Sequence, residues 1–242
     1  MPLHEPYHIE LNTAEDVTQY TLEQLTHINQ NASQIHGSIG VGRTQYEMFE
    51  QVAQDQSDLK RLFQEIAYYQ MDEYISGNPD HPQKLRNVIS DKLWRYIEKD
   101  SSLLNWFNNA VSPHDALEAM TANINAIGAL DFIVTGIGDD AHLGFIPEDT
   151  DFSKAVISCA VPPKTRIQNA GLWGGEDNVP SQCLTMGPKT FIEARHLFLM
   201  VTGQNKNKAL NSLLNDDNNY YRQIILHNKN THIISDAMAR GF

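Results

Sequence analysis

The sequence predicts an α/β protein built on a mainly parallel sheet with helices on both faces. Apolar runs of strand length alternate with amphipathic helical segments along the chain, an order typical of βαβ units. The chain has 242 residues, 41% of them hydrophobic and 20% charged, as is usual for globular proteins. This length suits one sizeable core, so we expect residues 1–242 to form a single domain.

The first half of the chain contains three predicted helices and two predicted strands. The first helix covers residues 11–29, where Thr13 and Asp16 resemble a capping box and apolar residues recur on one face. A short apolar run with glycines predicts a buried strand at 34–41, and helical periodicity follows Thr44. An apolar run predicts a second strand at 62–69, and the third helix is predicted at 82–99.

The second half continues this alternation. Residues 115–127 are predicted as a helix, and the clearest strand of the chain, 130–135 (LDFIVT), follows it and breaks at a glycine. Further strands are predicted at 155–161, 196–202 and 231–235, with a short helix after Pro188 and another helix at 205–214. A Rossmann-like sheet of this kind binds ligands beyond the carboxyl ends of its strands.

Composition excludes several classes of partner. The formal net charge of −12 argues against nucleic acid, whose phosphates require a basic face, but a local cationic pocket can still bind a small anion. No apolar run approaches the ~20 residues that span a membrane, and the first residues lack the pattern of a signal peptide. Cys159 and Cys183 are predicted to be reduced thiols. We therefore expect a cytoplasmic protein.

Two loops that follow predicted strands carry candidate binding and catalytic residues. The loop at 40–44 (GVGRT) joins a strand to a helix, where free N–H groups, a cation and a hydroxyl suit an anion, although such loops are often only tight turns. Asp72 and Glu73 follow the next predicted strand. Neighbouring side chains of an extended chain point in opposite directions, so at most one of them faces a substrate. The alternative is a solvated acidic turn.

The third loop, 136–145 (GIGDDAHLGF), formally matches a dinucleotide-binding fingerprint. That interpretation is disfavoured because Asp139 and Asp140 stand where a pyrophosphate needs donors. A better interpretation is that Asp140 orients the imidazole of His142, which would shuttle protons near neutral pH, although a structural histidine is nearly as plausible. The sequence contains no nucleophile elbow, zinc-protease motif or Walker A motif.

Several segments, in this order, resemble the glucosamine-6-phosphate deaminase/isomerase family, whose relatives include the 6-phosphogluconolactonases. The similarity runs from residue 34 to residue 237. Its motifs are 42–45 (GRTQ), 70–74 (QMDEY), 136–142 (GIGDDAH), 165–166 (TR), 184–187 (LTMG), 203–210 (GQNKNKAL) and the stretch from 226 to 236.

The resemblance implies a role for each matched residue. Asp72 would move a proton between C2 and C1 of an open-chain sugar, and His142, oriented by Asp140, would assist ring opening. The family glutamate that completes this relay is replaced by Pro147, and we expect the adjacent Glu148 to turn toward His142 and substitute for it in part. The sugar phosphate would be bound by Gly42, Arg43, Thr44, Arg166 and Lys208. No metal and no organic cofactor is implied.

The predicted function is therefore that of an isomerase or deaminase, a hydrolase by its release of ammonia. It would convert glucosamine or galactosamine 6-phosphate to fructose or tagatose 6-phosphate plus ammonia. The partner is a small sugar phosphate, and the resemblance is compatible with a homo-oligomer. Tyr74 after Asp72 and Glu73 favours the isomerases, because lactonases of this family tend to carry arginine there. The alternatives are a 6-phosphogluconolactonase-type hydrolase and a weakened, non-catalytic sugar-phosphate binding protein.

Overall fold

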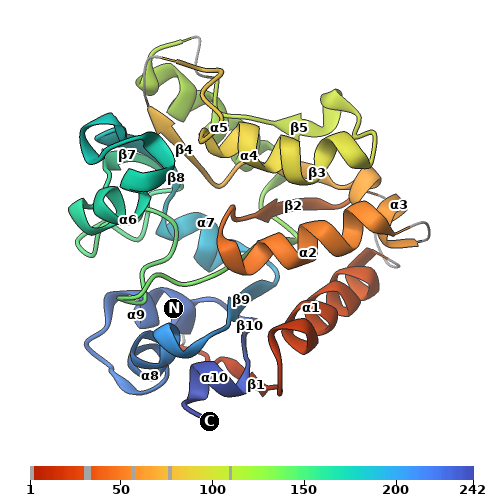
Figure 1. Cartoon of the computed structure of the whole chain (residues 1–242), viewed down its shortest axis with the longest axis vertical. Helices are drawn as coiled ribbons and strands as arrows, with labels where there is room; N and C mark the ends of the chain where they lie inside the picture. The colour runs from red at the N-terminus through yellow and green to blue at the C-terminus, as the bar shows by residue number, and fades with distance from the viewer. Residues whose placement is uncertain (1–2, 30–33, 56–57, 76–77, 109–110) are drawn as a thin grey trace.

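The computed structural model describes residues 3–29, 34–55, 58–75, 78–108 and 111–242, and contains a seven-stranded sheet in which neighbouring strands are all parallel (Figure 1). The prediction of a mainly parallel α/β sheet is confirmed. In sheet order the strands are β1 (Tyr7–Glu10), β10 (Thr231–Ser235), β9 (Leu197–Val201), β6 (Phe132–Thr135), β2 (His36–Ile39), β3 (Ala67–Tyr69) and β5 (Leu104–Asn105).

Helices cover both faces of this sheet because alternate strand residues point to opposite sides. On one face, β2, β6 and β9 pack against α1 (Ala14–Asn29), α2 (Arg43–Gln54), α3 (Asp58–Glu65) and α4 (Leu85–Lys92). On the other, β6 and β9 pack against α5 (Pro113–Ile127), α7 (Pro188–Glu193), α8 (Asn207–Asn215) and α9 (Tyr220–His227). The chain ends with α10 (Ala237–Arg240).

A second sheet, which the sequence did not predict, stands beside the first (Figure 1). It is antiparallel and consists of β4 (Asp72–Ile75), β8 (Gln182–Met186) and β7 (Val156–Ala160), in that order. We call it the small sheet. The helix α6 (Pro163–Trp173) follows β7, and Trp173 packs with residues of β4 and β8 in a separate apolar cluster.

Several predicted elements differ from the observed ones. The expected strand at 62–69 is wrong in its first part, where the chain forms α3 before β3 begins. Leu59, Leu62, Phe63 and Ile66 are spaced as on one face of a helix, and all pack into the core. The helix expected at 82–99 is split into α4 and a short 3-10 helix, Trp94–Tyr96. Seven further elements were not predicted from the sequence: β1, β4, β5, β8, α6, α9 and α10. None of the helices in the described residues has the length and apolar character needed to cross a membrane.

Glu73 joins β4 to α4 from inside the protein. Its side chain is fully buried, and its Oε2 accepts hydrogen bonds from Gln70 Nε2 at 2.9 Å and from the Arg86 amide at 3.0 Å. Its Oε1 accepts hydrogen bonds from the amides of Tyr74 at 2.8 Å and Leu85 at 3.1 Å. Leu85 and Arg86 begin α4, so this carboxylate caps the helix and satisfies donors that a helix start leaves unpaired.

We predict that Glu73→Gln lowers the free energy of unfolding by about 2–4 kcal/mol. The amide would turn an NH₂ group toward two backbone or side-chain donors and leave them without an acceptor in a buried site. Urea denaturation followed by circular dichroism measures this loss. The matched control is Glu65→Gln, at an exposed carboxylate that forms an ion pair with Arg61, where we expect a change below about 0.5 kcal/mol. Equal stability of the Glu73→Gln variant and the wild type would contradict the capping role.

Candidate active site

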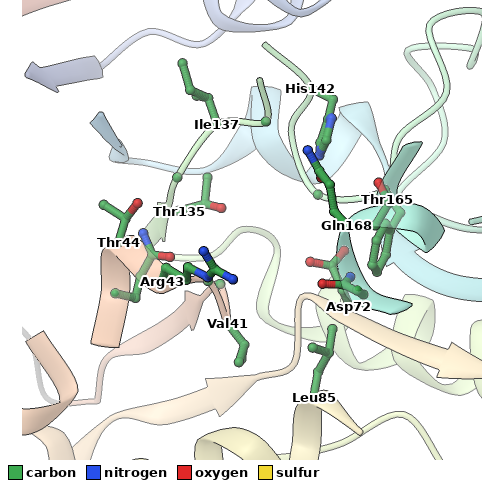
Figure 2. Close-up of a pocket in the computed structure, with 18 of the residues that line it drawn as sticks. Val41, Arg43, Thr44, Asp72, Leu85, Thr135, Ile137, His142, Thr165 and Gln168 are labelled. Atoms are coloured by element: carbon green, nitrogen blue, oxygen red, sulfur yellow. The ribbon is translucent and has the colours of Figure 1, made fainter. Parts of the chain in front are cut away.

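A cleft of about 650 Å³ opens where the main sheet meets the small sheet and α6. The residues that follow β2 and β6 line one part of it, Thr202 after β9 lines another, and Asp72, Tyr74 and the side chains of α6 line the rest. This is the carboxyl edge of the parallel sheet, where ligand sites form in open α/β folds. In Figure 2, Asp72 and His142 lie on one side of the cleft, while Arg43 and Thr44 lie on the other.

Asp72 is the carboxylate of β4 that faces the cleft. Its neighbour Glu73 points the other way into the core, as the alternation of an extended strand requires. Thr185, opposite Asp72 in the register of β4 and β8, donates a short hydrogen bond to Oδ1. Burial raises the pKa of Asp72 from 3.8 to about 7, against the opposing effect of the Thr185 hydroxyl. A carboxyl group with such a pKa can accept and return a proton at neutral pH.

His142 stands in the loop after β6 and is held by a carboxylate two residues earlier. Its Nδ1 lies 2.5 Å from Asp140 Oδ1, and its ring lines the cleft. Burial acts to raise the pKa of Asp140, but the imidazole and nearby backbone donors outweigh it and lower that pKa overall. Gly138 permits the arrangement, since a Cβ there would lie 2.2 Å from the imidazole. Ala141 adopts a left-handed φ of 72°, a conformation that favours the glycine of the family motif.

Glu148 does not reach this pair. It is exposed, it does not line the cleft, and within the described part of the chain it makes no hydrogen bond with His142. Pro147 and Thr150 close a turn through a backbone hydrogen bond of 3.1 Å, and Glu148 lies at its outer corner. The expected turn of Glu148 toward the imidazole is therefore absent from this conformation.

The opposite end of the cleft offers groups that bind anions. Gly42, Arg43 and Thr44 all line it, and α2 begins at Arg43 with no side chain capping its first N–H groups. Free N–H groups at a helix start, together with a guanidinium and a hydroxyl, suit a phosphate.

Two of the predicted phosphate residues do not face the cleft. Arg166 donates through Nη2 to the carbonyl oxygen of Glu176 at 3.1 Å, and Lys208 is exposed; neither lines the cleft. The residues of α6 that do line it are spaced as one helical face: Thr165, Gln168, Asn169, Leu172 and Trp173. Arg166 comes one residue after Thr165 and so points away from that face.

Lys206 is the lysine of this segment that lines the cleft, and the sequence analysis passed over it. Its Nζ lies 2.6 Å from Asp139 Oδ1, which also accepts a hydrogen bond from Asn205 Nδ2 at 3.1 Å. Asp139 Oδ2 accepts another from Gln168 Nε2 at 3.1 Å. The hydrogen bond from Lys206 is the main cause that lowers the pKa of Asp139, so this carboxylate is ionised and bridges two walls of the cleft.

An aromatic wall completes the cleft. Tyr74 and Trp173 meet edge to face with ring centroids 5.3 Å apart, and the Tyr74 hydroxyl accepts a hydrogen bond from Asn169 Nδ2 at 3.0 Å. Such a surface packs against the apolar face of a sugar. Across the described residues, no three His, Cys, Asp or Glu side chains converge as a metal site would require.

Comparison with known proteins gives consistent matches. The family model described as glucosamine-6-phosphate isomerases/6-phosphogluconolactonase matches residues 10–234. The glucosamine-6-phosphate deaminase of Aliivibrio fischeri is 26% identical over 160 residues, or 65% of this chain, and the chain spans only 60% of that relative's length.

Two solved structures show the same fold. A monomeric glucosamine-6-phosphate deaminase matches with a TM-score of 0.86 at 22% identity, covering 97% of this chain and 98% of that one. The 6-phosphogluconolactonase from Trypanosoma cruzi matches with a TM-score of 0.76 at 16% identity, covering 100% and 98%.

We predict that Asp72→Asn stabilises the protein at alkaline pH. Between about pH 4 and pH 7 the unfolded chain loses the Asp72 proton while the folded chain keeps it, so stability falls as the pH rises through this window. The neutral amide should raise the free energy of unfolding by about 2 kcal/mol at pH 8 and by almost nothing at pH 4, allowing for partial solvent screening through the cleft. Urea denaturation at both values measures this. A variant that is less stable than wild type at pH 8 would contradict the raised pKa.

Proposed function

Because the chain belongs to the family of glucosamine-6-phosphate isomerases and 6-phosphogluconolactonases, we propose that it is an enzyme that isomerises and deaminates an amino-sugar 6-phosphate. The observation that carries this proposal is the Asp72 carboxyl, whose pKa of about 7 suits proton transfer in a cleft shared with the His142–Asp140 pair. Glucosamine or galactosamine 6-phosphate would be the substrate, and fructose or tagatose 6-phosphate with ammonia the products.

The reaction would begin with ring opening. His142 would give a proton to the ring oxygen, the C1 hydroxyl would give its proton to a solvent water molecule in the open cleft, and the C1–O bond to the ring would break to leave the aldehyde. Asp140 at 2.5 Å from Nδ1 fixes the orientation of the His142 ring, which leaves Nε2 as the nitrogen that faces substrate.

Asp72 would then take the C2 proton and return it to C1. Removal of this proton forms an enolamine, and protonation at C1 gives the imine of the ketose phosphate. One water molecule then adds to the imine carbon and ammonia leaves, which gives the ketose phosphate. The substrate and water together contain all the atoms of the products, and no net oxidation or reduction occurs. One carboxyl can do both transfers because its pKa allows each protonation state at neutral pH.

The phosphate would bind at the end of the cleft where the start of α2 provides Arg43 and Thr44 (Figure 2), and Lys206, which also lines the cleft, would reach it from the segment before α8. Binding energy from a phosphate that does not react holds the reacting carbons against Asp72 and His142.

A 6-phosphogluconolactonase-type reaction is the second candidate. A His142–Asp140 pair without a second carboxylate, as seen here with Glu148 exposed, also suits activation of a water molecule that attacks a lactone. The two reactions differ in their need for Asp72, because only the isomerisation removes a proton from carbon.

The test of the proposed function is hydrogen exchange at C2. Wild-type enzyme with glucosamine 6-phosphate in D₂O should exchange the C2 hydrogen and release ammonia, as followed by proton NMR. Asp72→Asn should lower kcat by about 10²–10⁴-fold and leave KM nearly unchanged, because it removes a general base and keeps the phosphate contacts. Hydrolysis of 6-phosphogluconolactone without any C2 exchange would instead establish the second candidate.

We predict that Arg43→Ala and Lys206→Ala each weaken binding of the sugar phosphate about 10- to 100-fold, since each removes a charge-assisted contact. Isothermal titration with the phosphate ester and with the unphosphorylated sugar measures the loss. Lys208→Ala is the matched control, because this lysine lies two residues from Lys206 and is exposed outside the cleft. A larger loss in Lys208→Ala than in Lys206→Ala would overturn this placement of the phosphate.

A further inference from the structure

Thr185 is the buried hydroxyl that contacts the Asp72 carboxylate. It lies in β8 with no exposed surface, and the β4–β8 register sets it directly opposite Asp72. Its Oγ1 donates a short hydrogen bond to Asp72 Oδ1 and accepts one from the Phe145 amide at 3.3 Å. The amide can only donate, so the hydroxyl proton is free to be donated, and Asp72 Oδ1 lies closer to Oγ1 than the other acceptor, the Met186 carbonyl oxygen at 3.3 Å.

The loop before Phe145 is shaped around this contact. Gly144 has a φ of 54°, and a Cβ on it would come within 2.9 Å of both Asp72 Oδ1 and Thr185 Oγ1. Only a residue without a side chain lets the loop approach the pair so closely. The backbone at Gly144 therefore packs directly against the Asp72–Thr185 contact.

No cation compensates the Asp72 charge within the described part of the chain. The ionisable groups that face or adjoin it are carboxyl, phenol and thiol groups and one imidazole: Glu73 on β4, Tyr68 at β3, Tyr74 on β4, Cys183 on β8, Cys159 on β7 and His142 on the same side of the cleft. The buried Lys84 donates its hydrogen bond to the carbonyl oxygen of Tyr74. No Lys or Arg forms an ion pair with Asp72 among these residues. Two neutral hydrogen-bond donors, the Thr185 hydroxyl and the Phe145 amide, therefore lower the pKa of Asp72 against the effect of burial, which raises it.

We propose that Thr185 is a positioning residue that holds the Asp72 carboxylate toward the cleft and keeps its ionised, proton-accepting form available at neutral pH. The catalytic role of Thr185 rests on the proposed function, whereas its effect on the Asp72 carboxylate is a property of the protein without substrate. Without the hydroxyl, the carboxylate would lose its side-chain donor, and the neutral acid would predominate at pH 7.

The direct test is a pH titration of Asp72 in the substrate-free protein by ¹³C NMR of labelled carboxyl groups, with the signal assigned by its loss in Asp72→Asn. In Thr185→Val, which keeps the side-chain volume, we expect the midpoint to rise by about one to two pH units from the wild-type value of about 7. In Thr185→Ser, which keeps the hydroxyl, the midpoint should stay within a few tenths of a unit. Thr185→Ala provides a second hydroxyl-free variant if the valine does not fold.

Thr190→Val is the matched control. Thr190 is also buried, and its hydroxyl donates to the carbonyl oxygen of Ala155 at 2.7 Å, away from Asp72. Its removal should leave the Asp72 midpoint unchanged. An unchanged midpoint in both Thr185→Val and Thr185→Ala would overturn the proposal, whatever reaction the enzyme performs.

Kinetics give the second readout. In Thr185→Val the acidic limb of the kcat–pH profile for C2 exchange should move to higher pH together with the Asp72 midpoint. At pH 7 kcat should then fall at least about fivefold, and near pH 9 it should recover. KM should stay the same. A purely structural role would lower kcat equally at all pH values and would contradict the proposal. If the midpoint moves as expected but the wild type shows no C2 exchange, the proposed reaction fails and the role of Thr185 toward Asp72 stands.

Discussion

The alternation of side chains along β4 is the constraint on which the site depends. Because successive residues of a strand point to opposite sides, Glu73 enters the core and caps α4 while Asp72 faces the cleft. A shift of one residue between β4 and β8 would exchange these positions, bury Asp72 without its donors and separate it from Thr185. The same register therefore secures the fold and places the proposed base.

The cleft contains cationic side chains although the protein as a whole is acidic. The chain carries a net charge of −12, yet one end of the cleft has the start of α2 with Arg43, and Lys206 also lines the cleft. At the other end, no Lys or Arg of the described residues forms an ion pair with Asp72. The first end suits a phosphate, and the second keeps Asp72 near its midpoint at neutral pH. Asp139 reduces the positive charge that Lys206 offers, because it already pairs with this lysine and a bound phosphate would have to share it.

The sequence predicted the residues that directly follow strands and missed those whose position depends on helical phase. The alternating pattern and the loops after 34–41 and 130–135 were enough to place Gly42, Arg43, His142 and Asp140, since the edge of a parallel sheet brings such loops together. Arg166 and Lys208 were expected in the cleft, but one residue along a helix turns a side chain by about 100° and two turn it by about 200°. Lys206 could have been found from the helical phase of its segment. Of the small sheet only β7 was predicted as a strand; the sheet as a whole has no comparable local signal, because its strands are short and β4 pairs with β8 across more than a hundred residues.

The most direct test of the account is the stereochemistry of proton return to C1. The enzyme would act on glucosamine 6-phosphate in D₂O, and the fructose 6-phosphate formed would be examined by proton NMR. A single carboxyl held on one side of the sugar by β4 and Thr185 predicts that deuterium enters only one of the two C1 positions. Delivery of the substrate's own C2 hydrogen to the same C1 position is also what a single carrier predicts. Equal labelling of both C1 positions would contradict Asp72 as the group that carries the proton.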